Sequence, residues 1–309
     1  MSFHQLPEAQ GLYNPEFEHD ACGIGMYANI KGIPSHQIVK KGLEMLCRLE
    51  HRAGRGGDGK TGDGAGLLVQ IPHAFFQQNC TELNLPEMGE YGVGQIFFTE
   101  NENERLKIEQ KMNELIEQEN QQLIGWRTAP TNKENLSEIA KSTAPVVRQV
   151  FIRSNENDNK AFERKLYVIR KQLEHWATVQ QFELYIPSLS SQTIVFKGLL
   201  SPEEVSEFYI DLQDESFVSA LALVHSRYST NTFPSWKRAH PNRYIIHNGE
   251  INTLRGNINW MRAREQQFVS EAFGDDLEKL LPIIDTTGSD SSMLDNAFEF
   301  FVLAGRSPA

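Results

Sequence analysis

Segments with the periodicity of strands and of helices follow one another irregularly along this chain. The strand-like segments of the first half are residues 22–30, 67–71, 91–99 and 145–153. The segments with a helical period are residues 35–52, 102–120 and 159–177. The strands are joined by hairpin-like turns as well as by helices, without regular strand–helix–strand alternation. This order predicts a layered α+β fold.

The second half of the chain continues the mixed pattern. Ser201, Pro202 and Glu204 have the spacing of a capping box, which predicts a helix within residues 201–213. Residues 215–230 predict a strand that runs into a polar turn. Residues 244–253 predict a short apolar strand that ends in an Asn-Gly turn. A last helix is predicted within residues 286–305, where apolar side chains recur at helical spacing: Met293, Leu294, Ala297, Phe298, Phe301 and Val302.

Composition and charge exclude several classes of protein. The 309 residues are 39% hydrophobic and 10% aromatic, which is enough for a folded core of one or two domains. A formal net charge of −11 argues against nucleic acid or an anionic membrane as the main partner. No apolar run approaches the roughly 20 residues of a membrane helix. The first 21 residues lack the basic and apolar regions of a secretory signal. These features predict a cytoplasmic protein.

Neither the cysteines nor the histidines have the spacing of a metal site. Cys22, Cys47 and Cys80 are odd in number and far apart, which favours neither a disulfide framework nor a metal cluster. The histidines between residues 225 and 247 lack the spacing of zinc ligands. We therefore predict no metal in this chain, and structural roles for these histidines.

A glycine-rich stretch at residues 53–66 has the composition of a phosphate-binding loop but not its pattern. Free backbone N–H groups and small residues suit an anion. However, the GxxxxGK[ST] spacing is missing and no clear helix begins directly after the stretch. Asp58 and Asp63 would also repel a phosphate. We interpret the stretch as a loop that binds no nucleotide.

Three later motifs carry groups that suit the recognition of an amino acid or of a developing negative charge. Arg227, within HSRYSTNTFPSW, can hold a carboxylate or form a structural ion pair. Asn248 and Gly249, within IIHNGEINT, can form an oxyanion hole or an ordinary hairpin turn. Asp290, within TGSDSSMLD, can bind an ammonium group or cap a helix. Each motif alone leaves both interpretations open.

The motifs in their order along the chain resemble one family. CGIG at residues 22–25, TGDGAG at 61–66, RYST at 227–230, HNGEIN at 247–252 and GSDSSMLD at 288–295 are similar to the glutamine amidotransferase region of glutamate synthase large chains, most of all the bacterial ones. The resemblance runs over essentially the whole chain. It implies the fold of N-terminal-nucleophile hydrolases, an αββα sandwich of two antiparallel sheets between helical layers.

The resemblance also implies a reaction. Residues 1–21 would be a propeptide, so that Cys22 becomes the first residue of the mature domain, 22–309, with a free α-amino group. Its thiolate would attack the side-chain amide of L-glutamine and release ammonia and then glutamate. The Asn248 side chain and the Gly249 N–H would hold the oxyanion. The same resemblance implies that Arg227, with Thr230 nearby, holds the glutamine carboxylate, and that Asp290 binds its ammonium group.

A large chain of this family extends well beyond 309 residues. The resemblance therefore implies that the domain is shortened at its C-terminal end, and that a synthase domain of the same polypeptide, which aminates 2-oxoglutarate to glutamate, is absent. FMN and an iron–sulfur cluster are expected in that absent part, and a small NADPH-oxidising subunit is a further expected partner. Two alternatives stay open: an amidotransferase for another acceptor, and a glutamine-binding module without catalysis.

Overall fold

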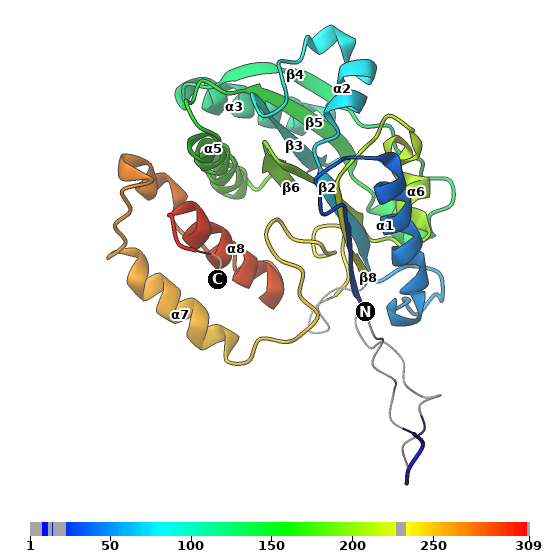
Figure 1. Cartoon of the computed structure of the whole chain (residues 1–309). Coiled ribbons are helices and arrows are strands. Elements are labelled where there is room, and N and C mark those ends of the chain that lie inside the picture. The colour runs from blue at the N-terminus through cyan, green and yellow to red at the C-terminus, as the bar shows by residue number, and fades with distance from the viewer. Residues whose placement is uncertain (1–7, 12–13, 15–22, 227–232, 308–309) are drawn as a thin grey trace.

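Two four-stranded sheets, antiparallel throughout, form the centre of the computed structural model, which describes residues 8–11, 14, 23–226 and 233–307 (Figure 1). The first sheet has the strand order β1-β8-β2-β7 and the second has the order β4-β5-β3-β6. The strands are β1 (Ile24–Ala28), β2 (Ala65–Gln70), β3 (Tyr91–Phe98), β4 (Gln122–Thr128), β5 (Val146–Arg153), β6 (Leu184–Ser190), β7 (Thr193–Gly198) and β8 (Leu221–Ser226). Cys22, Arg227 and Thr230 lie outside the described residues.

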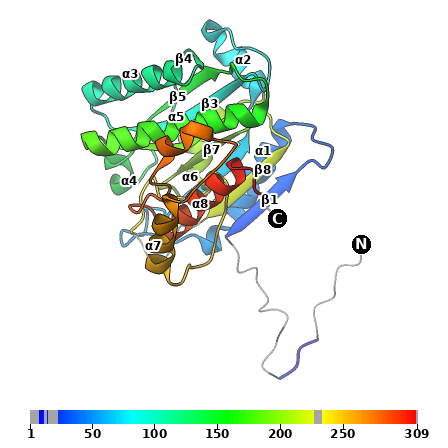
Figure 2. The same cartoon turned by 90° about the vertical axis from the view of Figure 1, so that its left-hand side faces the viewer.

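Helices flank this pair of sheets. They are α1 (His36–Arg48), α2 (His73–Asn79), α3 (Glu102–Gln118), α4 (Glu138–Ser142), α5 (Asn159–Gln180), α6 (Glu204–Phe208), α7 (Leu254–Glu265) and α8 (Asp290–Leu303). Helix α1 packs against the first sheet, whereas α3 and α5 pack against the second (Figure 2). Two antiparallel sheets between helices confirm the predicted α+β fold class.

The side chains of β3 show how the layers are held together. Every residue of this strand is buried, because both faces of the strand are covered. Val93 and Phe97 point into the largest apolar cluster, which draws residues from α1, α2 and both sheets. Ile96 and Phe98 point the other way, into a cluster with the apolar faces of α3 and α5. The period of two along the strand thus assigns alternate residues to two cores.

A third apolar cluster joins α5 to the C-terminal helices. Tyr167 and Val168 of α5 pack with Met293 and Phe300 of α8, and residues within and after α7 belong to or pack against the same cluster. Figures 1 and 2 both show α8 between α7 and the sheets. Helix α8 is therefore anchored in the body of the fold. Among the described residues, no helix is long and apolar enough to cross a membrane.

The helix predicted within residues 201–213 is shorter than its capping pattern suggested. The Ser201 N–H does donate to the Glu204 carboxylate at 2.7 Å, as a capping box requires. Nevertheless, α6 begins only at Glu204 and ends at Phe208, and a 3₁₀ turn (Ile210–Gln213) follows it. One hydrogen bond of the predicted capping box is thus present, but Ser201 does not cap α6, and the predicted helix length was wrong.

A chain of buried polar side chains connects the two sheets. Gln95 of β3 donates to the Val195 carbonyl of β7 at 2.9 Å, and Gln149 donates to the Gln95 side chain at 2.9 Å. Arg127 continues the chain, because it donates to Gln149 at 2.8 Å and forms two hydrogen bonds to the Asp211 carboxylate at 2.6 and 2.8 Å. Each side chain in this series forms a hydrogen bond with the next one. Removal of one side chain therefore leaves a polar group of its neighbour without a hydrogen-bond partner.

We expect Asp211→Ala to lower the free energy of unfolding by about 3–5 kcal/mol, because the half-buried Arg127 guanidinium would lose its charged partner and keep only the hydrogen bond to Gln149. Chemical denaturation followed by circular dichroism measures this loss. The exposed neighbour Glu215 provides the matched control: Glu215→Ala should change the free energy by less than about 0.5 kcal/mol. Equal stability of the two variants would contradict the role given to the Arg127–Asp211 pair.

Candidate active site

Three segments that are far apart in the sequence meet at one end of the first sheet. The Gly23 carbonyl accepts a hydrogen bond from the Ser226 N–H at 2.9 Å, and this bond extends the pairing of β1 with β8. A β-carbon at position 23 would lie 3.4 Å from the Asn248 side-chain oxygen and only 2.6 Å from the Ser226 carbonyl oxygen. The structure therefore brings Asn248 beside the residue that follows Cys22 and the residue that precedes Arg227.

The close approach at Gly23 explains why a glycine stands there. Any side chain at this position would collide with the backbone of β8. Without one, the backbone immediately after Cys22 can lie against both β8 and the Asn248 side chain.

The segment that carries Asn248 and Gly249 is not a strand, contrary to our prediction for residues 244–253. Its backbone forms no sheet pairing between residues 244 and 250. Instead the N–H groups of Tyr244 and Ile245 donate to one oxygen of the Asp295 carboxylate, at 2.8 and 2.9 Å. A buried side chain thus takes the place of a neighbouring strand. The sequence pattern could not reveal this, because a single aspartate on a distant helix leaves no periodic signal.

His247 connects this segment to β8 and to α8. The His225 Nε2 lies 3.2 Å from the His247 carbonyl oxygen, and the His247 Nδ1 lies 2.9 Å from the Ser291 hydroxyl. Because a carbonyl only accepts, the His225 Nε2 must carry the proton in the first contact. These two contacts fix the residue that immediately precedes Asn248.

Asp290 is the first residue of α8, but it does not cap that helix. Ser289 is the cap, since its hydroxyl accepts a hydrogen bond from the Ser292 N–H at 3.2 Å. The buried Asp290 carboxylate accepts instead from the N–H groups of Ile251 and Ser291, at 3.0 and 2.7 Å. The structure thereby removes the capping interpretation of Asp290 and places its charge next to the segment that carries Asn248.

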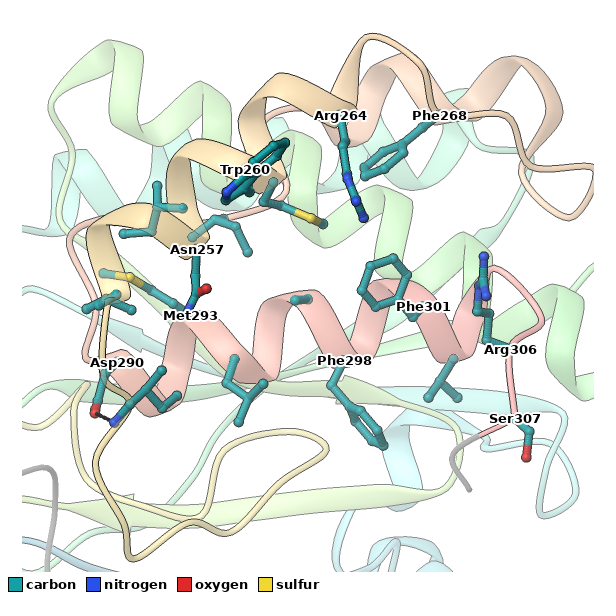
Figure 3. Close-up of a pocket in the computed structure, with 18 residues that line it drawn as sticks. Asn257, Trp260, Arg264, Phe268, Asp290, Met293, Phe298, Phe301, Arg306 and Ser307 are labelled. Carbon is teal, nitrogen blue, oxygen red and sulfur yellow. Dashed lines mark hydrogen bonds between the residues drawn. The ribbon is translucent and has the colours of Figure 1, made fainter.

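Asp290 also lies at one end of a groove between α7 and α8 (Figure 3). The groove has a volume of about 860 Å³ and is lined mainly by apolar side chains, among them Met261, Met293 and Phe301. A zwitterion such as a free amino acid does not match such a lining. Asp290 lies beside Ile251 in the lining of this groove, and its carboxylate accepts the hydrogen bond from the Ile251 N–H.

Two buried basic side chains lie beneath this site. Burial lowers the pKa of His240 well below its usual value, and the adjacent His225, whose ring stacks on it with centroids 4.5 Å apart, lowers it further. Burial also lowers the pKa of Lys197 well below its usual value, and its amine donates to the Tyr185 hydroxyl at 2.8 Å. Neither residue was predicted to belong to the site. Among the described residues, no group of three or more His, Cys, Asp or Glu side chains could hold a metal.

The glycine-rich loop of residues 53–66 has its own internal hydrogen bonds. The Asp58 carboxylate accepts from the N–H groups of Lys60 and Thr61, at 3.0 and 2.9 Å, and from the Thr61 hydroxyl. The bond from the Thr61 side chain, together with these amides, lowers the pKa of Asp58 to about 2. An anionic side chain therefore already occupies two of the loop's backbone amides.

The structure thus has an α+β fold of two antiparallel sheets in which the Asn248 side chain lies beside Gly23, just before the first strand. The sequence profile described as class-II glutamine amidotransferases matches residues 22–309. The chain belongs to this family, and the resemblance found in its motifs is confirmed.

The chain is also similar to glutamate synthases from bacteria, fungi and plants. It is 66% identical over its full length to the glutamate synthase [NADPH] large chain of Bacillus subtilis (strain 168), of which it covers 20%. It is 43% identical to glutamate synthase [NADH] of Saccharomyces cerevisiae, with 97% of this chain and 14% of the relative covered. It is 40% identical to ferredoxin-dependent glutamate synthase 1 of Arabidopsis thaliana, with 98% of this chain and 19% of the relative covered. The chain thus spans a fifth or less of the length of these relatives.

Proposed function

We propose that this domain hydrolyses L-glutamine to glutamate and ammonia with Cys22 as its nucleophile. The observation that carries the proposal is the close approach of the Asn248 side chain to Gly23. It places a side-chain amide, whose NH₂ group can donate in an oxyanion hole, beside the residue bonded to Cys22. The membership of the chain in the class-II glutamine amidotransferases supports the same reaction.

The nucleophile needs a base, and we propose that its own α-amino group supplies one. A free thiol has a pKa of about 8.5 and is mostly protonated at neutral pH. An α-amino group has a pKa of roughly 7.7–8.0, so its neutral fraction can accept the thiol proton directly or through a water molecule. An amide nitrogen within an uncut chain cannot. Removal of residues 1–21 as a propeptide would create the base, and the family match begins at Cys22.

The chemical steps follow from these groups. The Cys22 sulfur attacks the side-chain carbonyl carbon of glutamine, and the Asn248 side chain and the Gly249 N–H donate to the oxygen that becomes negative. The tetrahedral intermediate collapses, the C–N bond breaks, and the departing nitrogen takes a proton and leaves as ammonia. Water then attacks the thioester and releases glutamate, which returns the thiol to its starting state.

Recognition of free glutamine requires groups for both ends of its backbone. We propose that Arg227 holds the carboxylate, with Thr230 beside it, and that Asp290 binds the ammonium group. The buried position of the Asp290 carboxylate, next to the segment that carries Asn248, supports its part of this assignment. A peptide-bound glutamine lacks both charges and would be rejected.

Arg227→Ala should raise the KM for glutamine by about 10²-fold while changing kcat far less, because a charged hydrogen-bonded pair at the substrate carboxylate is lost. Initial rates of ammonia release over a range of glutamine concentrations measure both constants. Arg153→Ala, at an exposed strand end, provides the matched control and should leave both unchanged. An unchanged KM in Arg227→Ala would remove this residue from the carboxylate site.

We further propose that the ammonia serves a synthase domain of the same longer polypeptide, which aminates 2-oxoglutarate to glutamate in the cytoplasm. The glutamate synthase names of the relatives support this assignment. FMN and an iron–sulfur cluster would then belong to other domains of that polypeptide, and a small NADPH-oxidising subunit would be a separate chain. Glutamine binding, measured by calorimetry, and ammonia release, measured on the same cut protein, test the first step of this proposal. Cut protein that binds glutamine but releases no ammonia would be a glutamine-binding module and not a glutaminase.

A further inference from the structure

We propose that Asp295 is a positioning residue that holds the Asn248–Gly249 pair in place for catalysis. The kinetic part of this inference rests on the proposed glutaminase function. Its structural part does not, because it follows from the contacts of one buried carboxylate with one segment of backbone.

The carboxylate of Asp295 binds three consecutive backbone N–H groups. One oxygen accepts from Tyr244 and Ile245 at 2.8 and 2.9 Å, and the other lies 3.3 Å from the Arg243 nitrogen. Asp295 itself is only 1% exposed. Hydrogen bonds to a buried charged acceptor are stronger than those between neutral groups, so this side chain fixes the backbone of residues 243–245 firmly.

The other contacts of the segment come from the start of the same helix and from β8. Ser291 contacts the His247 side chain, Asp290 accepts from the Ile251 N–H, and His225 contacts the His247 carbonyl. Asn248 and Gly249 therefore lie in a short span that is held on both sides. Asp295 lies one turn of α8 beyond Asp290 and Ser291, and it holds the backbone further upstream, at residues 243–245.

A displacement of this span would act on the transition state more than on substrate binding. An oxyanion donor helps only when it lies within hydrogen-bond distance of the oxygen as negative charge develops. A misplacement of about 1 Å can cost about 10²-fold in rate. Loss of the upstream hold should therefore lower kcat, whereas the KM for glutamine, which depends on Arg227 and Asp290 in our proposal, should change much less.

The chemistry of the three contacts predicts a graded series of variants. Asp295→Asn keeps the volume and one acceptor oxygen for Tyr244 and Ile245, but it turns an NH₂ group toward the Arg243 N–H. Asp295→Leu removes every acceptor. We expect kcat to fall about 10-fold in the first variant and about 10²-fold in the second, with the KM within about threefold of the original chain.

A buried carboxylate one turn further along α8 supplies the control. Glu299 is 4% exposed and pairs with Arg170 of α5, which is linked through Glu174 to the Arg243 side chain rather than to the backbone amides that Asp295 binds. Glu299→Gln should lower the melting temperature but keep kcat, once rates are divided by the concentration of reactive Cys22 thiol. Titration of that thiol with an alkylating glutamine analogue makes the comparison independent of any unfolded fraction.

Hydrogen–deuterium exchange of the peptide that contains Tyr244 and Ile245 is the second readout, and it needs no activity. Exchange at these amides should rise about 10-fold or more in Asp295→Leu and stay unchanged in Glu299→Gln. If the original chain releases ammonia and Asp295→Leu keeps its kcat, the positioning role is overturned while the glutaminase function stands. If cut original chain releases no ammonia, the proposed function fails, and unchanged exchange in Asp295→Leu would overturn the structural part as well.

Discussion

Cys22→Ala should release no ammonia from glutamine above the uncatalysed background, because the variant lacks the thiol that we propose as the nucleophile. We expect a loss of at least about 10⁴-fold in kcat, since removal of a covalent nucleophile leaves only binding and oxyanion stabilisation. The measurement is an enzyme-coupled ammonia assay at saturating glutamine. The variant should also keep residues 1–21, because we expect maturation itself to need the thiol.

The other two thiols provide the controls for this result. Burial raises the pKa of Cys80 to about 11, and burial also raises the pKa of Cys47. Both thiols therefore stay protonated at neutral pH and are poor nucleophiles. Cys47→Ala and Cys80→Ala should retain kcat. A second pair of chains, which begin with a removable methionine followed directly by Cys22 or by alanine at that position, separates loss of the nucleophile from failure to mature. Ammonia release near the original rate in the alanine chain would contradict the assignment.

Asn248→Ala should lower kcat by about 10²–10³-fold, the usual cost of one lost oxyanion-hole donor. The KM for glutamine should change little, because the donor acts as charge develops on the substrate oxygen. Asn248→Asp is the sharper variant, since it keeps the shape of the side chain and replaces a donor by a negative charge. It should be at least as slow as Asn248→Ala.

Asn257→Ala is the matched control for these two variants. Asn257 is exposed and lines the groove between α7 and α8, apart from Gly23. The Asn257→Ala variant should therefore keep the original kcat. If kcat falls by less than about threefold in both Asn248 variants, Asn248 does not belong to the oxyanion hole.

Periodic segments with a clear apolar pattern were predicted well, and irregular ones were not. Strands β1, β2, β3 and β5 and helices α1, α3, α5 and α8 all fall within or largely within the segments predicted for them. Strand β6 was missed: Pro187 interrupts its pattern, and its pairing with β3 shifts register between Gln95 and Phe97. Strand β7 was missed as well, and it carries the buried Lys197, whose charge hides a core position from a hydrophobic pattern.

The site divides in a similar way. Linear motifs were sufficient to identify Asn248, Gly249 and Asp290 as candidates, and the structure brings the segment of the first two next to the third. The residues that hold the segment were not found from the sequence. Asp295 and Ser291 act from a helix about fifty positions away from their partners in the chain, and each is a common residue whose role depends on folding. Only their contacts in three dimensions reveal it.

In our proposal, the domain becomes a glutaminase when Cys22 becomes its first residue. The most direct test is the intact mass and N-terminal sequence of the purified protein, measured on the same sample as ammonia release from glutamine. We predict that chains beginning at Cys22 release ammonia and that uncut chains release almost none. Uncut chains that release ammonia as fast as cut ones would contradict the claim.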